Sequence, residues 1–163
     1  MQSKKIKRVK VQGFTLLELI VTLAIAGVLL SYAIPSFRDF GLRQKVSNEA
    51  NELLGDLMYA RVTAIKEGQS VVVLSNNGTD WSNGWRIFID NNRDLTFNAG
   101  DIALREKQLT HSNLTLTAVS GSVAYTNLGN ALAINNISIT HGDISKAVTL
   151  NLSLSGVITT IES

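Results

Sequence analysis

The chain carries one long, unbroken apolar run near its start. From Phe14 to Ile34 there are 21 residues, and Glu18 is the only one among them that is charged at neutral pH. A helix rises about 1.5 Å per residue, so this run spans roughly 32 Å, close to the hydrocarbon thickness of a bilayer. The pattern predicts a transmembrane helix over residues 14–34.

Apolar residues continue at helical spacing after Pro35. They are Phe37, Phe40, Val46, Ala50, Leu53, Leu54, Leu57, Met58, Ala64 and Ile65. Positions three and four residues apart share one face of a helix, and over residues 46–65 this face is expected to cover a sheet. We predict one helix from Thr15 to Glu67, amphipathic over residues 35–67 and ended by Gly68. Proline lacks an amide hydrogen, so Pro35 is expected to kink or loosen this helix.

After Gln69 the apolar residues recur at every second position. Alternating or short apolar runs predict strands at residues 71–74, 85–89, 114–118, 132–139, 148–154 and 157–161. The alternation changes phase at Asn135 and Asn136, which predicts a bulge or a tight turn there. One helix and several half-buried strands predict an α+β fold, with two antiparallel sheets packed on the helix like a β-sandwich. Residues 69–163 form this globular domain.

Positive charge is concentrated before the apolar run. The basic residues there are Lys4, Lys5, Lys7, Arg8 and Lys10. The whole chain has a net charge of +2, but without these five residues ten basic residues face thirteen acidic ones, a charge of −3. A basic segment before an apolar helix is typical of a cytoplasmic flank, so the net charge is poor evidence of nucleic-acid binding. The absence of cysteine excludes disulfides and thiolate chemistry.

Glu18 needs a partner, because a carboxylate inside a membrane-length segment is costly. If the mature chain begins at Phe14, its free α-amine offers a positive charge to the Glu18 of a neighbouring subunit. Two simpler interpretations remain, a cleaved secretory signal peptide and a plain signal anchor. The first needs small residues at a cut site after the apolar run, where the chain has residues 35–38, PSFR. The second tolerates one polar residue near the end of the helix.

The run Gly13-Phe14-Thr15-Leu16-Leu17-Glu18, after its basic leader, resembles the class III signal of type IV prepilins and type II secretion pseudopilins. The resemblance implies that a membrane prepilin peptidase removes residues 1–13 as a cytoplasmic leader. The cut falls between Gly13 and Phe14, and the new amine of Phe14 is methylated. The resemblance also implies roles in assembly for Glu18 and for Pro35, which stands where pilins tend to have proline.

A second segment adds to the resemblance. Residues 84–94, GWRIFIDNNRD, followed by Gly100-Asp101 and Leu104-Arg105, are similar to a segment of the H pseudopilins and of the FimT and FimU minor pilins. This implies the pilin fold, with the other pilin or pseudopilin subunits, the prepilin peptidase and an inner-membrane assembly platform as partners. It implies a single pass through the bacterial inner membrane, with the N-terminus cytoplasmic and the C-terminal domain periplasmic, before entry into a pilus or pseudopilus.

Polar residues between positions 90 and 101 follow the spacing of an EF-hand loop. Positions one, three, five, seven, nine and twelve are Asp90, Asn92, Asp94, Thr96, Asn98 and Asp101. However, Leu95 stands where the loop requires glycine, and Asp101 replaces the bidentate glutamate. We therefore interpret the segment as a hydrophilic turn in which Asp and Asn bond their own backbone, and keep it as a weak candidate calcium site.

The sequence shows no catalytic constellation. His111 and His141 are expected in exposed turns, and neither has a second metal ligand at a regular spacing. There is no G-x-S-x-G elbow and no phosphate loop. Trp81 and Trp85 flank a turn, and we expect one inside the domain and the other exposed. We expect no enzyme activity, no cofactor and no resident metal.

FimT-like pilins, which this chain resembles, include DNA receptors in which a C-terminal Gly-Arg-x-Arg motif supplies phosphate-binding charge. The matching residues are Gly156-Val157-Ile158-Thr159, so the glycine is kept and both arginines are absent. Over residues 110–163 the only Lys or Arg is Lys146, against Asp143 and Glu162, and such a surface releases few counterions from DNA. DNA is therefore an unlikely partner for this tail. Four other basic residues could form a separate patch: Arg86, Arg93, Arg105 and Lys107.

Together with these patterns, the resemblance implies a minor pilin or pseudopilin, a non-enzymatic structural subunit of a type IV pilus or a type II secretion pseudopilus. It would assemble through its N-terminal helix. Two alternatives remain open at this stage. One is a DNA-binding competence pilin, and the other is a membrane-anchored periplasmic domain unrelated to filaments.

Overall fold

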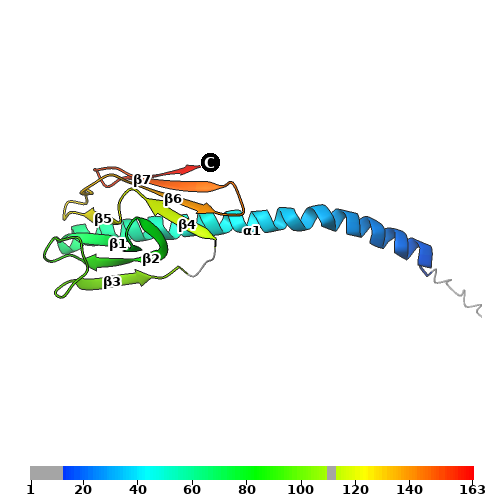
Figure 1. Ribbon diagram of the computed structural model, residues 1–163, viewed down its shortest axis with the longest axis horizontal. Helices are drawn as coiled ribbons and strands as arrows, with labels where there is room; N and C mark the ends of the chain where they lie inside the picture. Colours follow the sequence, from blue (N-terminus) through cyan, green and yellow to red (C-terminus); the bar gives the residue numbers. More distant parts are fainter. Residues whose placement is uncertain (1–12, 110–112) are drawn as a thin grey trace, which may run out of the picture. The chain divides into compact units, whose positions relative to one another are not determined.

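The computed structural model describes residues 13–109 and 113–163. One long helix precedes eight strands (Figure 1). The elements are α1 (Leu16–Glu67), β1 (Val71–Asn77), β2 (Asp80–Ile89), β3 (Ile102–Lys107), β4 (Leu114–Ala118), β5 (Ser122–Tyr125), β6 (Asn135–His141), β7 (Ala147–Leu152) and β8 (Ile158–Glu162). The chain divides between Arg38 and Asp39 into two compact units, so α1 contributes to both.

Local sequence signals set both ends of α1. At its start the amide of Glu18 donates to Oγ1 of Thr15 at 3.2 Å, so the threonine caps the first turn. At its end Gly68 has a φ of 68°, the left-handed conformation that ends many helices. The helix is unbroken through Pro35. The predicted helix therefore agrees with the structure to within one residue at each end.

All strand pairs are antiparallel and form one sheet in the order β5-β1-β2-β4-β6-β7-β8, with β3 paired to β2 beside this path. The strands lie alongside the second half of α1 (Figure 1). β2 and β4 are joined at a single residue pair, Asp80 with Thr117. The sequence predicted two sheets, whereas the structure has one antiparallel sheet. Its two halves meet at the single pair between β2 and β4.

The core lies between the sheet and one face of α1. The buried positions of the helix are Val46, Glu49, Ala50, Leu53, Asp56, Leu57, Ala60 and Ala64, which recur every three or four residues. The apolar ones belong to one cluster with residues of the strands, such as Leu114 and Leu116 of β4 and Leu150 of β7. Strands β4, β6 and β7 place every second side chain in the core.

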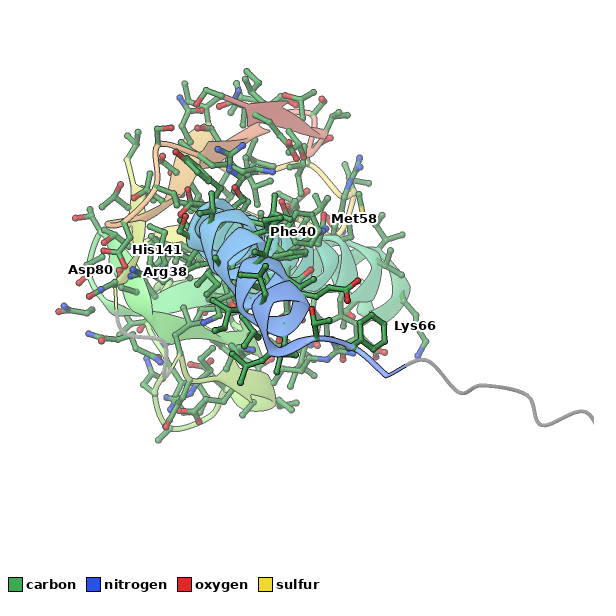
Figure 2. The ribbon with its side chains drawn as sticks, turned by 90° about the vertical axis from the view of Figure 1, so that its right-hand side faces the viewer. Arg38, Phe40, Met58, Lys66, Asp80 and His141 are labelled. Atoms are coloured by element: carbon green, nitrogen blue, oxygen red, sulfur yellow. The ribbon has the colours of Figure 1, made fainter. Side chains whose placement is uncertain are left out.

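The buried face of α1 is narrower than the sequence suggested. Met58 and Ile65, expected on this face, are 51% and 52% exposed. In a view along the helix, Met58 lies on the side of α1 away from Asp80 and His141 (Figure 2). Ala64 is buried as expected, and Ala60, which was not expected on this face, is also fully buried.

Several details of the strands differ from the prediction. The run 132–139 is not one bulged strand: β6 begins at Asn135, and Leu132 and Ile134 before it are exposed. Strands β3 and β5 were not predicted, because β3 carries charged residues and β5 is only four residues long. The prediction that one tryptophan is exposed was wrong, since Trp81 and Trp85 are both fully buried.

Burial of both tryptophans is tolerated because each indole N–H has a hydrogen-bond acceptor, which offsets the cost of removing this polar group from water. Nε1 of Trp81 donates to the carbonyl of Ser120 at 3.1 Å, and Nε1 of Trp85 donates to Oδ2 of Asp56 at 2.8 Å. The other oxygen of Asp56 accepts from Arg105 of β3 at 3.0 Å. Asp56 thus joins α1 to both β2 and β3 through one buried carboxylate.

Two cations of β3 reinforce this junction. The guanidinium of Arg105 lies 3.8 Å from the ring centroid of Tyr59, a cation–π contact. Nζ of Lys107 lies 2.6 Å from Oε1 of Glu52 and 3.9 Å from Oε1 of Glu49. Burial opposes the charge of Lys107, but the hydrogen bond that it donates to Glu52 and the nearby carboxylates raise its pKa overall.

Among the described residues, every buried side chain lies at Val46 or later. The unit 39–163 therefore contains the whole core seen in the described chain, and we expect a fragment of these residues to fold without the apolar half of α1. Cooperative unfolding of this fragment provides the measurement for two predictions.

Replacing Asp56 with alanine removes the acceptor of Trp85 and the carboxylate partner of Arg105. We expect a loss of about 2–4 kcal/mol in the free energy of unfolding of the fragment, measured with urea. Asp56→Asn should lose less, because its amide oxygen can still accept from the indole. Glu52→Ala is the matched control on the exposed side of the same junction and should cost at most about 1 kcal/mol. An equal effect of both alanine variants would contradict the role given to Asp56.

Tyr125 of β5 carries a buried polar group whose removal should stabilise the fragment, in contrast to the removal of the Asp56 carboxylate. Its hydroxyl is buried and, in the part of the chain that is described, has no hydrogen-bond partner. Burial raises the pKa of Tyr125 well above its usual value, against the opposing charge of Arg61. Stability from this group is complete below the unfolded pKa of about 10 and is lost as the pH rises through the folded pKa.

Tyr125→Phe should therefore stabilise the fragment by about 1 kcal/mol at neutral pH, because it removes an unpaired buried hydroxyl. Its advantage should increase above about pH 10, where only wild type loses the contribution of this group. Urea unfolding at neutral and alkaline pH tests both statements, with Tyr59→Phe as the control. A less stable Tyr125→Phe variant would show that the hydroxyl has a partner.

Candidate functional site

The N-terminal segment places its distinctive residues on an open helix. Phe14 is 86% exposed, and Glu18 lies in the exposed first turn of α1. The first half of α1 also exposes its large apolar residues: Leu16, Leu17, Leu19, Ile20, Val21, Leu23, Ile25, Val28, Leu29, Leu30, Tyr32 and Ile34. By length and composition this helix can cross a membrane, and none of its most apolar stretch is buried within the described chain.

Glu18 is suited to its position at the start of α1. A carboxylate in the first turn interacts favourably with the positive end of the helix dipole. The backbone amide of Glu18 donates to Thr15, and Glu18 is exposed on the outside of the helix. The geometry can thus offer this negative charge to a cation on another chain.

The four basic residues considered as a DNA-binding patch do not form one. Arg86 pairs with Glu106 at 3.0 Å and lies 4.5 Å from the ring centroid of Phe97. Arg105 and Lys107 pair with carboxylates of α1, as described above. Within the described ranges, Arg93 alone of the four makes no ion pair. Neutralised cations attract phosphate weakly, so this region gives no support to DNA binding.

Gly156, the glycine that the tail keeps from the DNA-receptor motif, lies in a tightly packed position. Arg61 of α1 donates from Nε to the carbonyl of Gly129 at 2.8 Å and from a terminal nitrogen to the carbonyl of Ser155 at 3.0 Å. Gly156 has a φ of 75°, and a Cβ on it would lie 2.2 Å from the Gly129 carbonyl oxygen. Glycine is therefore required there by its positive φ and by the close approach of the Gly129 carbonyl and of Arg61, independently of the residues that follow it.

The loop 90–101 uses its carboxylates internally. Both oxygens of Asp90 accept backbone amides, from Arg93 at 2.8 Å and from Leu95 at 3.0 Å. Asp101 accepts the amides of Asn91 and Asn98. These bonds are the Asp and Asn turns expected from the sequence, and they occupy oxygens that a calcium ion would need.

Asp94 completes the loop. It accepts the amide of Thr96 at 2.8 Å and the side-chain amides of Asn92 and Asn98. The bond from Thr96 lowers the pKa of Asp94, helped by the two asparagines. The residues that the structure describes contain no group of three or more His, Cys, Asp or Glu placed to hold a metal.

The histidine prediction was wrong for one residue and is not addressed for the other. His141 ends β6 with its side chain buried, and its Nδ1 accepts the amide of Asp143 at 3.2 Å. Its position opposite Leu114 of β4 in the ladder explains why it is covered. His111 lies outside the described residues.

The chain matches two described families. Residues 49–156 match type II transport protein GspH, and residues 8–34 match the prokaryotic N-terminal methylation motif. The first match covers more than half of the chain. The second includes Gly13, Phe14 and Glu18, the residues singled out in the sequence.

Two curated relatives are fimbrial proteins of Pseudomonas aeruginosa, each 39% identical over 61 residues, or 37% of this chain. The match covers only 39% of each relative.

Two crystal structures of the Pseudomonas aeruginosa (strain PAO1) type IV minor pilin FimU share the fold. The first has a TM-score of 0.62 at 20% identity and covers 75% of this chain and 92% of that chain. The second has a TM-score of 0.56 at 19% identity and covers 72% and 91%. The family match and the shared architecture agree: the chain belongs to the GspH family and has the fold of a pilin.

Proposed function

We propose that the protein is a minor pilin or pseudopilin, a non-enzymatic structural subunit of a type IV pilus or a type II secretion pseudopilus. The observation that carries the proposal is the exposed first half of α1, which bears an apolar surface and one carboxylate at its start. Such a surface is costly in water and needs either lipid or other apolar helices around it. In a subunit that moves from a membrane into a filament, this surface is covered first by lipid and then by the apolar helices of other subunits.

In this proposal residues 1–13 are a cytoplasmic leader that a prepilin peptidase removes. The cut before Phe14 creates the free amine, which the same enzyme methylates. Residues 14–34 then hold the subunit in the inner membrane, with residues 69–163 in the periplasm. The match of residues 8–34 to the N-terminal methylation motif supports this order of events.

The amine of Phe14 and the carboxylate of Glu18 are proposed to pair between neighbouring subunits. In an apolar surrounding, each charge alone would be strongly unfavourable, and pairing offsets part of that cost. Because the two groups lie close to the same helix end, the pair would set the axial position of one helix against the next. Pro35 would assist assembly by weakening the helix where its amide hydrogen bond is missing.

Replacing Glu18 tests the assembly step. Glu18→Ala should insert into the membrane and be processed normally, since an apolar residue suits the bilayer, but its incorporation into filaments should fall at least about tenfold. Quantitative immunoblots of membrane and sheared filament fractions give the two amounts. The matched control is Thr22→Ala, one helical turn further along the same segment, which should be incorporated at the wild-type level.

Normal incorporation of Glu18→Ala would contradict the pairing. Failure of wild-type protein to enter any filament or to cross-link with other pilins would contradict the proposed function itself. It would favour a membrane-anchored periplasmic domain.

A further inference from the structure

A small pocket lies beyond the end of α1, beside the loop that follows β2. Its volume is about 160 Å³, and Gly68 at the helix end forms part of its wall. The side chains that line it include Ser70, Arg93, Leu95, Thr126, Asn127 and Leu132. Ligand pockets for drug-sized molecules are usually several times larger, so this one has room for a single side chain.

Two walls of the pocket are held in an unusual backbone conformation. Arg93 and Leu95 have φ angles of 61° and 63°, a left-handed conformation that side chains disfavour. Asp90, which is 2% exposed, accepts the backbone amides of both residues and so fixes them. Leu95 also packs on the buried cluster that contains Phe88. The pocket is therefore formed before any ligand arrives, and strained residues of this kind often cluster at binding sites.

The pocket has the chemistry to bind a carboxylate on a short apolar stem. Arg93 makes no ion pair within the described ranges, although Arg86, Arg105 and Lys107 are paired. Ser70, Thr126 and Asn127 add hydroxyl and amide groups, which can donate to an anion. Leu95 and Leu132 offer apolar contact to the methylene groups beside such a carboxylate.

The surroundings of the pocket fit a protein partner. Leu132 is 55% exposed at its wall, and the neighbouring Leu128 is 76% exposed. Exposed apolar side chains around a charged pocket are typical of an interface that buries one anchoring residue at its centre.

We propose that this pocket receives an acidic side chain of a neighbouring filament subunit, bound through Arg93. The inference rests on the proposed function for the identity of the partner. It concerns a contact between globular domains, separate from the contact between N-terminal helices through Glu18. Charge complementarity selects the acidic residue, and the small volume limits the insertion to one side chain.

Site-specific photo-cross-linking tests the contact in cells that assemble the filament. A photoreactive residue at Leu128 of the full-length chain should cross-link to another pilin subunit. Arg93→Glu should reduce this product at least about fivefold, and Arg93→Lys should retain part of it, because the charge remains but the planar donors are lost. A photoreactive residue at Thr117 on β4 is the control and should give a pattern that Arg93→Glu does not change.

Arg93→Gly separates binding from folding. Glycine adopts a positive φ without strain, so this variant should melt at the wild-type temperature or higher while losing the Leu128 cross-link. An undiminished cross-link in both Arg93→Glu and Arg93→Gly would overturn the proposal.

Binding of a defined probe tests the chemistry directly. With detergent-solubilised full-length protein, N-acetyl-glutamate N-methylamide should shift the amide resonances of Ser70 and Leu95 with a dissociation constant in the millimolar range. The matched glutamine compound should bind at least about fivefold more weakly, and Arg93→Gly should abolish the preference. Equal binding of both compounds, or tighter binding of inorganic phosphate, would overturn the assignment of an acidic side chain. A clear preference for glutamate without a cross-link from Leu128 to a pilin would overturn the assignment of a filament subunit as the partner, whereas failure of the proposed function would appear as absence of the wild-type protein from filaments.

Discussion

The constraint on which the rest of the structure depends is that α1 is covered along only part of its length. Its second half buries a narrow face against the sheet, whereas the first half exposes a nearly continuous apolar surface. Burial of apolar area is the main source of stability, so the exposed half needs a cover that the described chain does not supply. Membrane lipid and the helices of other subunits would both meet this need, so under the proposed function one helix would serve as anchor and as assembly element.

The covered half is joined to the sheet by polar contacts as well as by its apolar face. Asp56 connects α1 to Trp85 of β2 and Arg105 of β3. Five residues further along α1, Arg61 donates to the carbonyls of Gly129, between β5 and β6, and of Ser155, between β7 and β8. The two halves of the sheet, which share only one residue pair, are thus each attached to the helix by a side chain that the helix itself provides.

How much the sequence could predict depended on the range of the interactions. The helix ends at Thr15 and Gly68 are set by adjacent residues, and the N-terminal signal is a run of neighbours, so both could be read directly. The burial of Trp85 depends on Asp56, 29 residues away, and the need for glycine at position 156 depends on the backbone carbonyl of Gly129, which is likewise distant in the sequence. Strand β3 was missed because its charges are neutralised by carboxylates of α1, which no local pattern reveals. The pocket at Arg93 joins residues 68–132 and is likewise a product of the tertiary fold.

The central claim is that this family member is processed to begin at Phe14 and then assembles through its exposed helix. Intact-mass and N-terminal peptide analysis of the protein from cells that contain a prepilin peptidase measures this most directly. The expected mature chain starts at N-methylated Phe14. The Gly13→Ala variant should remain uncut. A mature protein that starts at any other residue, or that keeps residues 1–13, would contradict this claim.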